Sequence, residues 1–471
     1  MREKGRNSGR NPAGKVGWVD VLCSIRPLKI KVLTYSVLTL FWVMGCIWFV
    51  LQRIPGAYEA LRTPIELLFD VAVLILGVWT LRNRWDIAVV ISYLVISLTT
   101  TLIINGHSIV FWLNGSRMYF SILFMLPIFR WLLSTRERSI YFITRMDKSI
   151  YIFLWIQLPC VIYQYLAFGG GDYGGGSLGN LNSGTISTLI YAMSFYLMLK
   201  RWDNEKSYMQ NLLNNRTLIF LLLPSFMNET KISFVYLVLY FLFLVPFNRR
   251  FLINMLYVIP AVVLMTFLAG YVYLQTNEIP DYMKSMDFLE YYVIGDEQTY
   301  EIMENLFDSE GDTDENRDFM RGAKFLMLPT VMTDKPHGLW LGYGASQFKG
   351  GTVMEQTHFA KKYEWFLYGT STQLMQVQLD MGLLGDIWLL FYMCVLFGWI
   401  GKGGRLKGQM QWFLMGEFII ILIYASFLSM PIFALPYVYL VALSSRWNLV
   451  EDTLSYERKN ASESDLTRLE G

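Results

Sequence analysis

The sequence predicts an all-α, polytopic membrane protein with about twelve transmembrane helices and one long external loop. Composition is the first observation: 54% of the 471 residues are hydrophobic and only 17% are charged, whereas a soluble protein of this size needs more polar surface. The second is the length of the apolar runs, many of which reach the roughly 17–25 residues that a bilayer core requires. The third is the uneven distribution of Lys and Arg between alternate loops.

Apolar runs bounded by charged or turn residues place the spans. They lie near 33–52, 65–81, 86–105, 118–133, 150–168, 184–199, 217–227, 232–247, 252–274, 379–400, 411–429 and 432–445. The seventh and eighth are short and are separated only by the polar residues Asn228–Lys231. Because a polar break at membrane depth is tolerated where it lines a protein cavity, this break is a candidate part of a site.

The basic residues predict the orientation of the chain. With the N-terminus inside, 28 of the 40 Lys and Arg fall on the inner side, and 8 of the other 12 lie in the long loop. Cytoplasmic loops carry such an excess, so both termini are predicted to be cytoplasmic. The predicted organisation is a cytoplasmic N-terminus (1–32), nine helices (33–275), an external loop with short helices (276–378), three helices (379–445) and a cytoplasmic tail (446–471).

The external loop is acidic, with 17 Asp and Glu against 8 Lys and Arg. Asp308, Glu310 and Asp312 have the spacing of a calcium-binding loop, but Asp or Thr stands where an EF-hand requires Gly. A solvated acidic surface is therefore predicted instead of a metal site. No metal ion, cofactor or nucleic acid is predicted as a partner.

Four basic residues on the predicted outer face are candidates for binding an anion. Arg117 begins the fourth span, Lys231 ends the polar break, and Arg317 and Arg321 head a predicted helix of the loop. A charge at membrane depth costs about 2.5–3.5 kcal/mol on insertion scales. Snorkelling of Arg117 and pairing of Lys231 with Glu229 would explain two of them. A convergent cluster would instead suit a pyrophosphate, whose charge it would hold as it leaves.

Two further residues on this face could move a proton. His337 lies in the turn Pro336–Gly344, and Asp380 lies at the outer end of the tenth span. An external His is more often an ordinary surface residue, and Asp380 could be an interfacial helix-end acid. The alternative for each is a base or an orienting group beside the cations.

Four short motifs follow one another along the chain, all on the predicted outer face. They are Gly179–Asn182 at the opening of a span, Asn228–Lys231 before an apolar helix, Arg321, Phe325 and Pro336 ahead of Gly342–Phe348, and Ser371–Thr372 followed by Asp380–Gly385. In this order they resemble the O-antigen polymerase and O-antigen ligase superfamily of bacterial integral membrane glycosyltransferases. The corresponding family motifs are Gly-x-Asn, Ser-x-Ser-Arg, an Arg–aromatic–Pro spacing before Pro-x-x-Gly-x-Gly, and His-Asn before an acid and Gly-x-x-Gly.

The resemblance implies a GT-C-like fold in the bacterial inner membrane, with the long loop in the periplasm. It also implies transfer of a glycan from an undecaprenyl-diphosphate donor to another lipid-linked repeat unit, giving O-antigen or a related surface polysaccharide without a metal ion. Membrane lipids and a chain-length regulator are the further implied partners. The implied site consists of pyrophosphate-binding Arg117, Lys231, Arg317 and Arg321; catalytic candidates Glu229, His337 and Asp380; and glycan-binding Asn180, Asn182, Tyr343 and Ser371.

Two departures from the family pattern bear on the reaction. Ser371 and Thr372 stand where ligases have His-Asn, which favours a polymerase and leaves the general base unassigned. Lys231 replaces an Arg, which keeps the charge but loses the bidentate fork.

Three alternatives remain open. The nearest is a ligase that transfers finished glycan to lipid A core. A secondary transporter is suggested by about twelve spans, although the two halves are unlike and only Asp70 and Glu417 are candidate intramembrane charges. A non-catalytic membrane scaffold is the third.

Overall fold

The computed structural model describes residues 30–169, 173–180, 182–228, 231–245, 260, 301, 303, 319, 321–345, 347, 356–369, 371–399 and 408–457. All regular structure within these ranges is helical, which confirms the predicted all-α class for this part of the chain. Five helices in it are long and apolar enough to cross a membrane: Ile30–Leu51, Arg84–Ile104, Ile109–Leu132, Arg136–Phe168 and Gln373–Leu396. Their length and composition are those of a helical membrane protein.

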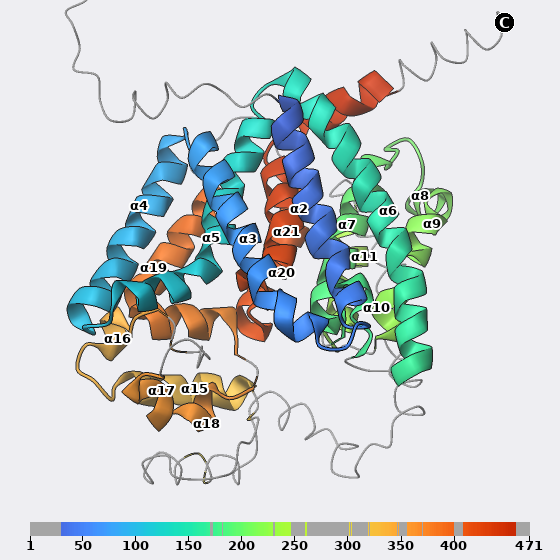
Figure 1. Cartoon of the computed structure of the whole chain (residues 1–471). Coiled ribbons are helices and arrows are strands. Elements are labelled where there is room, and N and C mark those ends of the chain that lie inside the picture. Colours follow the sequence, from blue (N-terminus) through green and yellow to red (C-terminus); the bar gives the residue numbers. More distant parts are fainter. Residues whose placement is uncertain are drawn as a thin grey trace, which may run out of the picture.

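The helices form a bundle with a smaller group of helices beyond one of its ends (Figure 1). The bundle comprises α2 (Ile30–Leu51), α3 (Ala57–Thr80), α4 (Arg84–Leu98), η1 (Thr99–Ile104), α5 (Ile109–Leu132), α6 (Arg136–Phe168), η3 (Gly176–Leu178), α7 (Ser183–Lys200), α8 (Tyr208–Asn214), α9 (Arg216–Phe220), α10 (Leu223–Met227), α11 (Lys231–Leu244), α19 (Gln373–Leu396), α20 (Gly408–Tyr424), η5 (Phe427–Ser429) and α21 (Pro431–Ser444). The smaller group comprises α15 (Arg321–Met332), α16 (Gly338–Leu341), α17 (His358–Lys362) and α18 (Glu364–Leu367).

Helices overlap every predicted span that falls within the described residues. The span predicted over 252–274 lies outside them apart from residue 260. The largest difference is α6, which begins at Arg136 instead of near 150. Its first turns keep an apolar side, on which Phe142, Ile143 and Met146 are fully buried, and this burial extends the helix beyond the membrane-length run.

Two helices form the centre of the bundle. Nearly every side chain of α7 is buried, and so is nearly every side chain of α21 from Phe433 onward. A helix that is apolar or small on all sides is expected in the interior. The surrounding helices keep one exposed apolar face, on which Leu68 of α3 and Leu166 of α6 are 70% and 80% exposed, as expected for side chains that contact lipid.

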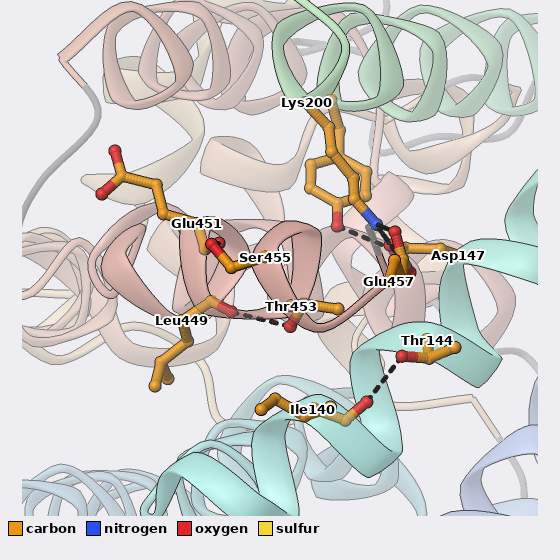
Figure 2. Close-up of polar contacts among 10 residues, drawn as sticks. Ile140, Thr144, Asp147, Lys200, Leu449, Glu451, Thr453, Ser455 and Glu457 are labelled. Atoms are coloured by element: carbon orange, nitrogen blue, oxygen red, sulfur yellow. Dashed lines mark hydrogen bonds and ion pairs between the residues drawn. The ribbon is translucent and has the colours of Figure 1, made fainter. Parts of the chain in front are cut away.

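An ion-pair network links three helices at the end of the bundle opposite α15–α18 (Figure 2). Lys200 Nζ lies 2.6 Å from Asp147 Oδ2 and 3.2 Å from Glu457 Oε2. The Tyr196 hydroxyl donates to Asp147 Oδ1 over 2.7 Å. Because Asp147, Lys200 and Glu457 come from α6, α7 and the helical segment 448–457, the network fixes the end of the described chain to the bundle.

Asn228, the part of the polar break after the seventh span whose side chain is described, is buried. Residues 216–227 form α9 and α10, which together extend about 18 Å, less than the roughly 30 Å hydrocarbon core. Asn228 ends α10 and is fully buried, and its Nδ2 donates to Gly174 O over 3.2 Å and to Ser187 Oγ over 3.0 Å. Side chains and backbone of the same protein thus satisfy this amide, as a polar break inside a membrane requires.

The glycine-rich segment packs tightly against α6. Gln157 of α6 accepts from Ser177 N over 2.9 Å, and Gln164, also of α6, accepts from Gly176 N over 2.7 Å. Gly179 has φ +84°, and a Cβ there would lie 2.5 Å from Gln52 Oε1. Glycine is needed here because the backbone approaches side-chain amides closely.

Candidate active site

A charged cavity of about 270 Å³ lies between helices of the bundle. The cavity is formed where α2, α3, α5, η3 and α19 meet the segment 426–432. Its polar lining consists of Arg62, Glu66, Asp70, Arg117, Asn182, Gln376, Ser426 and Ser429. Trp48 and Tyr58 add two aromatic rings. Charged groups that line a cavity between apolar helices mark this cavity as the candidate site.

Arg117 is held in the cavity by two carboxylates of α3. Its Nε lies 2.9 Å from Asp70 Oδ2, and its Nη2 lies 3.6 Å from Glu66 Oε2. Arg62 Nε in turn lies 3.1 Å from Glu66 Oε1. Two formal positive charges therefore face two formal negative charges. Arg117 is therefore a paired cation at a polar cavity.

The local sequence explains how these charges reach one place. Arg62, Glu66 and Asp70 are spaced four residues apart on α3, which puts them on one face of the helix. Ser108 caps α5 by accepting from Phe111 N over 3.2 Å, which fixes where the helix begins and so where Arg117 faces.

Two of the sequence motifs meet beside this cavity. Helix α19 bends at Gly382, which has φ +61° and ψ −156°. The two carbonyls before the bend, of Leu379 and Asp380, accept from Tyr343 N over 2.7 Å and from Gly344 N over 3.1 Å. The Gly-Tyr-Gly turn thus replaces helical hydrogen bonds that the bend removes.

Glycine is required on both sides of this junction. A Cβ on Gly382 would lie 2.5 Å from Leu341 N, and one on Gly342, which has φ +68°, would lie 2.6 Å from Met381 N. The two backbones are in direct contact, and there is no room for a side chain between them.

Asp380 accepts a hydrogen bond from a residue of α5. Its carboxylate is 2% exposed and accepts from the Tyr119 hydroxyl over 2.8 Å. Tyr119 lies two residues after Arg117, and Asp380 lies one helical turn after Gln376, so the contact joins the two helices next to the cavity lining. Asp380 itself is not among the lining residues.

Arg321 is the predicted cation that keeps its charge unpaired among the described residues. Its guanidinium carbon lies 4.2 Å from the centre of the Tyr424 ring, a cation–π contact. Tyr424 lies just before Ser426 and Ser429, which line the cavity. Arg321 therefore extends from α15 to the end of α20, two residues before the part of the cavity lining that begins at Ser426.

The structure gives the remaining described candidates mainly structural contacts. His337 Nε2 lies 3.3 Å from Asn105 Oδ1. Tyr343 is buried, its hydroxyl donates to Val331 O over 2.9 Å, and burial raises the pKa of that hydroxyl. Ser371 Oγ accepts from Gln376 Nε2 over 3.0 Å, so it orients an amide of the cavity lining.

The two asparagines predicted to bind glycan differ. The Asn180 side chain accepts from Gln164 Nε2 over 3.2 Å, which helps to hold the glycine-rich segment. Asn182 lines the cavity, and its Nδ2 donates to Leu178 O over 2.9 Å. Of the two, Asn182 is placed to contact a ligand.

Some predicted residues fall outside the described part of the chain. Glu229 and Arg317 lie outside it, as does the acidic run 308–315, and only the backbone of Lys231, at the start of α11, is described. Among the residues that are described, no three His, Cys, Asp or Glu side chains are grouped closely enough to hold a metal ion.

Several lining residues were not predicted as site residues. The sequence contains a pattern that could have indicated three of them as site residues. Charges spaced four residues apart in an apolar helix are found at Arg62, Glu66 and Asp70. Trp48 and Tyr58 show no such pattern, because aromatic residues are frequent throughout this chain.

No protein-family model matches this chain, and no curated protein is similar to it. The fold and cavity define a helical membrane protein with a charged site towards one end of its bundle. Its activity is therefore argued from the site and from the motif order.

Proposed function

We propose that this protein is a glycosyltransferase that polymerises undecaprenyl-diphosphate-linked oligosaccharide repeat units at the outer face of the bacterial inner membrane. The observation that carries the proposal is the charged cavity beside the junction of the Gly-Tyr-Gly turn and α19. Motifs separated in the sequence by more than thirty residues meet there, and Arg117, Asn182 and Arg321 lie in or beside the same cavity.

The proposed reaction is a substitution at the anomeric carbon of the donor. An acceptor hydroxyl forms the new C–O bond, the bond from that carbon to the lipid diphosphate breaks, and the diphosphate leaves with the electron pair. The hydroxyl proton passes to a base, for which Glu229 and His337 are the candidates. Asp380 is assigned to positioning, because its carboxylate is buried against Tyr119.

Arg321 is the strongest candidate for holding the leaving pyrophosphate. It makes no ion pair within the described residues, whereas Arg117 is shared between Asp70 and Glu66. An unpaired guanidinium binds phosphate oxygens in a bidentate fashion and stabilises charge that develops as the diphosphate leaves.

The location of the cavity supports the proposed sidedness. The cavity is lined by Met44 and Trp48 from the C-terminal part of α2 and by Tyr58 and Arg62 from the start of α3. In Figure 1 these helix ends lie on the side of the bundle that carries α15–α18, which belong to the loop that the distribution of Lys and Arg places outside. Lipid-linked repeat units in the outer leaflet would reach it from that side.

The test uses purified protein in nanodiscs with native undecaprenyl-diphosphate-linked repeat units, with and without EDTA. A ladder of products on a gel, unchanged by EDTA, is the expected result. Well-folded protein that gives no ladder but transfers pre-made glycan to lipid A core would replace the polymerase with the ligase alternative.

One observation favours the transporter alternative. Glu417 of α20 is fully buried, and neither of its carboxylate oxygens has a hydrogen-bond partner among the described residues. Buried intramembrane acids often bind or relay protons. Under the polymerase proposal, Glu417→Gln leaves the ladder unchanged and proteoliposomes show no proton flux. Proton flux that Glu417→Gln abolishes, with no ladder from either protein, would favour the transporter.

A further inference from the structure

We infer that the cavity is a subsite for one uncharged sugar residue of the glycan, and that the pyrophosphate binds outside it. This inference rests on the proposed function and assigns a substrate class to the cavity. It also separates the roles of two arginines that were both predicted to bind pyrophosphate, because Arg117 then belongs to the sugar subsite and Arg321 to the pyrophosphate.

The charge balance of the cavity is the first argument. Arg62 and Arg117 are both in ion pairs, at 3.1 Å with Glu66 and at 2.9 Å with Asp70. A pyrophosphate in this space would face two carboxylates as well as two guanidinium groups, so their repulsion would offset the attraction. A site built for a multiply charged anion carries an excess of cations, and the described lining of this cavity carries none.

The hydrogen-bonding groups are the second argument. Guanidinium and amide N–H groups donate, the carboxylates of Glu66 and Asp70 accept, and the hydroxyls of Ser426 and Ser429 do both. A sugar hydroxyl also both donates and accepts hydrogen bonds. A lining with donors and acceptors therefore matches it, whereas a lining of donors alone would not. Of the two carboxylates, Glu66 is the accessible one, with a side chain 26% exposed.

Part of this lining is held in place before any ligand binds. Ser371 Oγ accepts from Gln376 Nε2, and Ser429 Oγ donates to Gln376 Oε1 over 3.0 Å. Both ends of the Gln376 amide are therefore oriented. Fixed amides lower the entropy cost of binding a polar ligand.

Shape and size are the third argument. The Trp48 and Tyr58 rings meet edge to face with centroids 6.0 Å apart, and they give the polar cavity an aromatic wall. The apolar C–H face of a pyranose packs on such a ring while its hydroxyls reach the polar groups. At about 270 Å³ the cavity is slightly below the roughly 300 Å³ at which drug-sized pockets begin, so it fits one sugar residue and excludes a whole repeat unit.

The test measures binding without catalysis. Wild-type protein in nanodiscs is titrated with the delipidated repeat-unit oligosaccharide and, separately, with inorganic pyrophosphate, and contacts are observed by saturation-transfer NMR. The oligosaccharide is expected to bind through one sugar residue, and pyrophosphate is expected not to compete with it. Glu66→Gln removes a charged acceptor and is expected to weaken oligosaccharide binding about tenfold or more.

Matched variants control for folding. Asp334→Asn removes a carboxylate that pairs with Lys362 outside the cavity and should leave oligosaccharide binding unchanged. Asn182→Ala is a second cavity variant that keeps the ion pairs intact, and it should weaken the oligosaccharide as well. Oligosaccharide binding that neither Glu66→Gln nor Asn182→Ala weakens would overturn the inference, as would pyrophosphate binding that Arg117→Gln abolishes.

The outcomes separate this inference from the proposed function. Oligosaccharide binding that depends on Glu66, without a ladder, would support the sugar subsite and count against the polymerase. A ladder together with pyrophosphate bound in the cavity would support the polymerase and overturn the subsite.

Discussion

The first prediction concerns how much the ion pair between Arg117 and Asp70 contributes to the free energy of unfolding. The Nε–Oδ2 distance is 2.9 Å, and the two side chains are 18% and 6% exposed. Breaking a buried pair by removing one partner costs roughly 3–5 kcal/mol, and an exposed pair contributes about 0–1 kcal/mol. Because Arg117 faces the cavity and keeps Glu66 at 3.6 Å, we expect Asp70→Asn to lower the free energy of unfolding by about 2 kcal/mol.

A double-mutant cycle isolates this pair, which matters because Asp70 has further contacts. Free energies of unfolding are measured in mild detergent for Asp70→Asn, Arg117→Gln and the double variant. The expected coupling is about 1–2 kcal/mol, since each single variant removes the same interaction. A coupling below about 0.5 kcal/mol would mean that the pair behaves as a surface salt bridge, and the view of Arg117 as a clamped residue of the cavity would be wrong.

Three further predictions follow from backbone geometry, from burial of a histidine and from a capping hydroxyl. Gly382→Ala forces a side chain into a φ of +61° and against Leu341 N, so we expect it to lower the stability by about 1–3 kcal/mol, measured by thermal unfolding. Gly408→Ala is the control, because a Cβ there meets no atom within 4 Å, and it should be neutral. Equal melting temperatures for the two variants would refute the close contact at Gly382. Burial lowers the pKa of His107, so on acidification the unfolded state binds a proton before the folded state does. Stability should therefore fall as the pH drops below about 6.5. His107→Gln should flatten this dependence of stability on pH, and an unchanged dependence would contradict the role given to His107. Ser108→Ala removes the cap of α5 and should cost about 1 kcal/mol, measured by the same melt, whereas Ser134→Ala, after that helix, should cost less.

The helical membrane class was predictable because apolar run length is a direct physical signal. A bilayer fixes the length of a spanning helix, and the described helices overlap the predicted runs. Boundaries were less predictable where packing adds to this signal. Helix α6 starts earlier because Phe142, Ile143 and Met146 are buried, and α19 starts at Gln373 and bends at Gly382.

The candidate site was predictable only in part. The sequence identified Arg117, as a charge on the predicted outer face, and Asn182 and Arg321, through motif order, and all three lie in or beside one cavity. It could not reveal that Glu66 and Asp70 neutralise Arg117, because an ion pair between α3 and α5 depends on how the helices pack. It also could not distinguish Asn182, which lines the cavity, from Asn180, which holds a loop, since the two have the same chemistry and lie only two positions apart.

The most direct test of the central claim compares polymer formation by wild-type protein with that by Arg321→Ala and Arg321→Lys, at equal amounts of folded protein. If Arg321 holds the leaving pyrophosphate, Arg321→Ala should slow ladder formation about 10²-fold. Lys should restore only part of the rate, because it keeps the charge without the bidentate fork. A ladder of full length and normal rate from Arg321→Ala would contradict the proposed pyrophosphate site, and a wild-type protein that forms no ladder would contradict the polymerase itself.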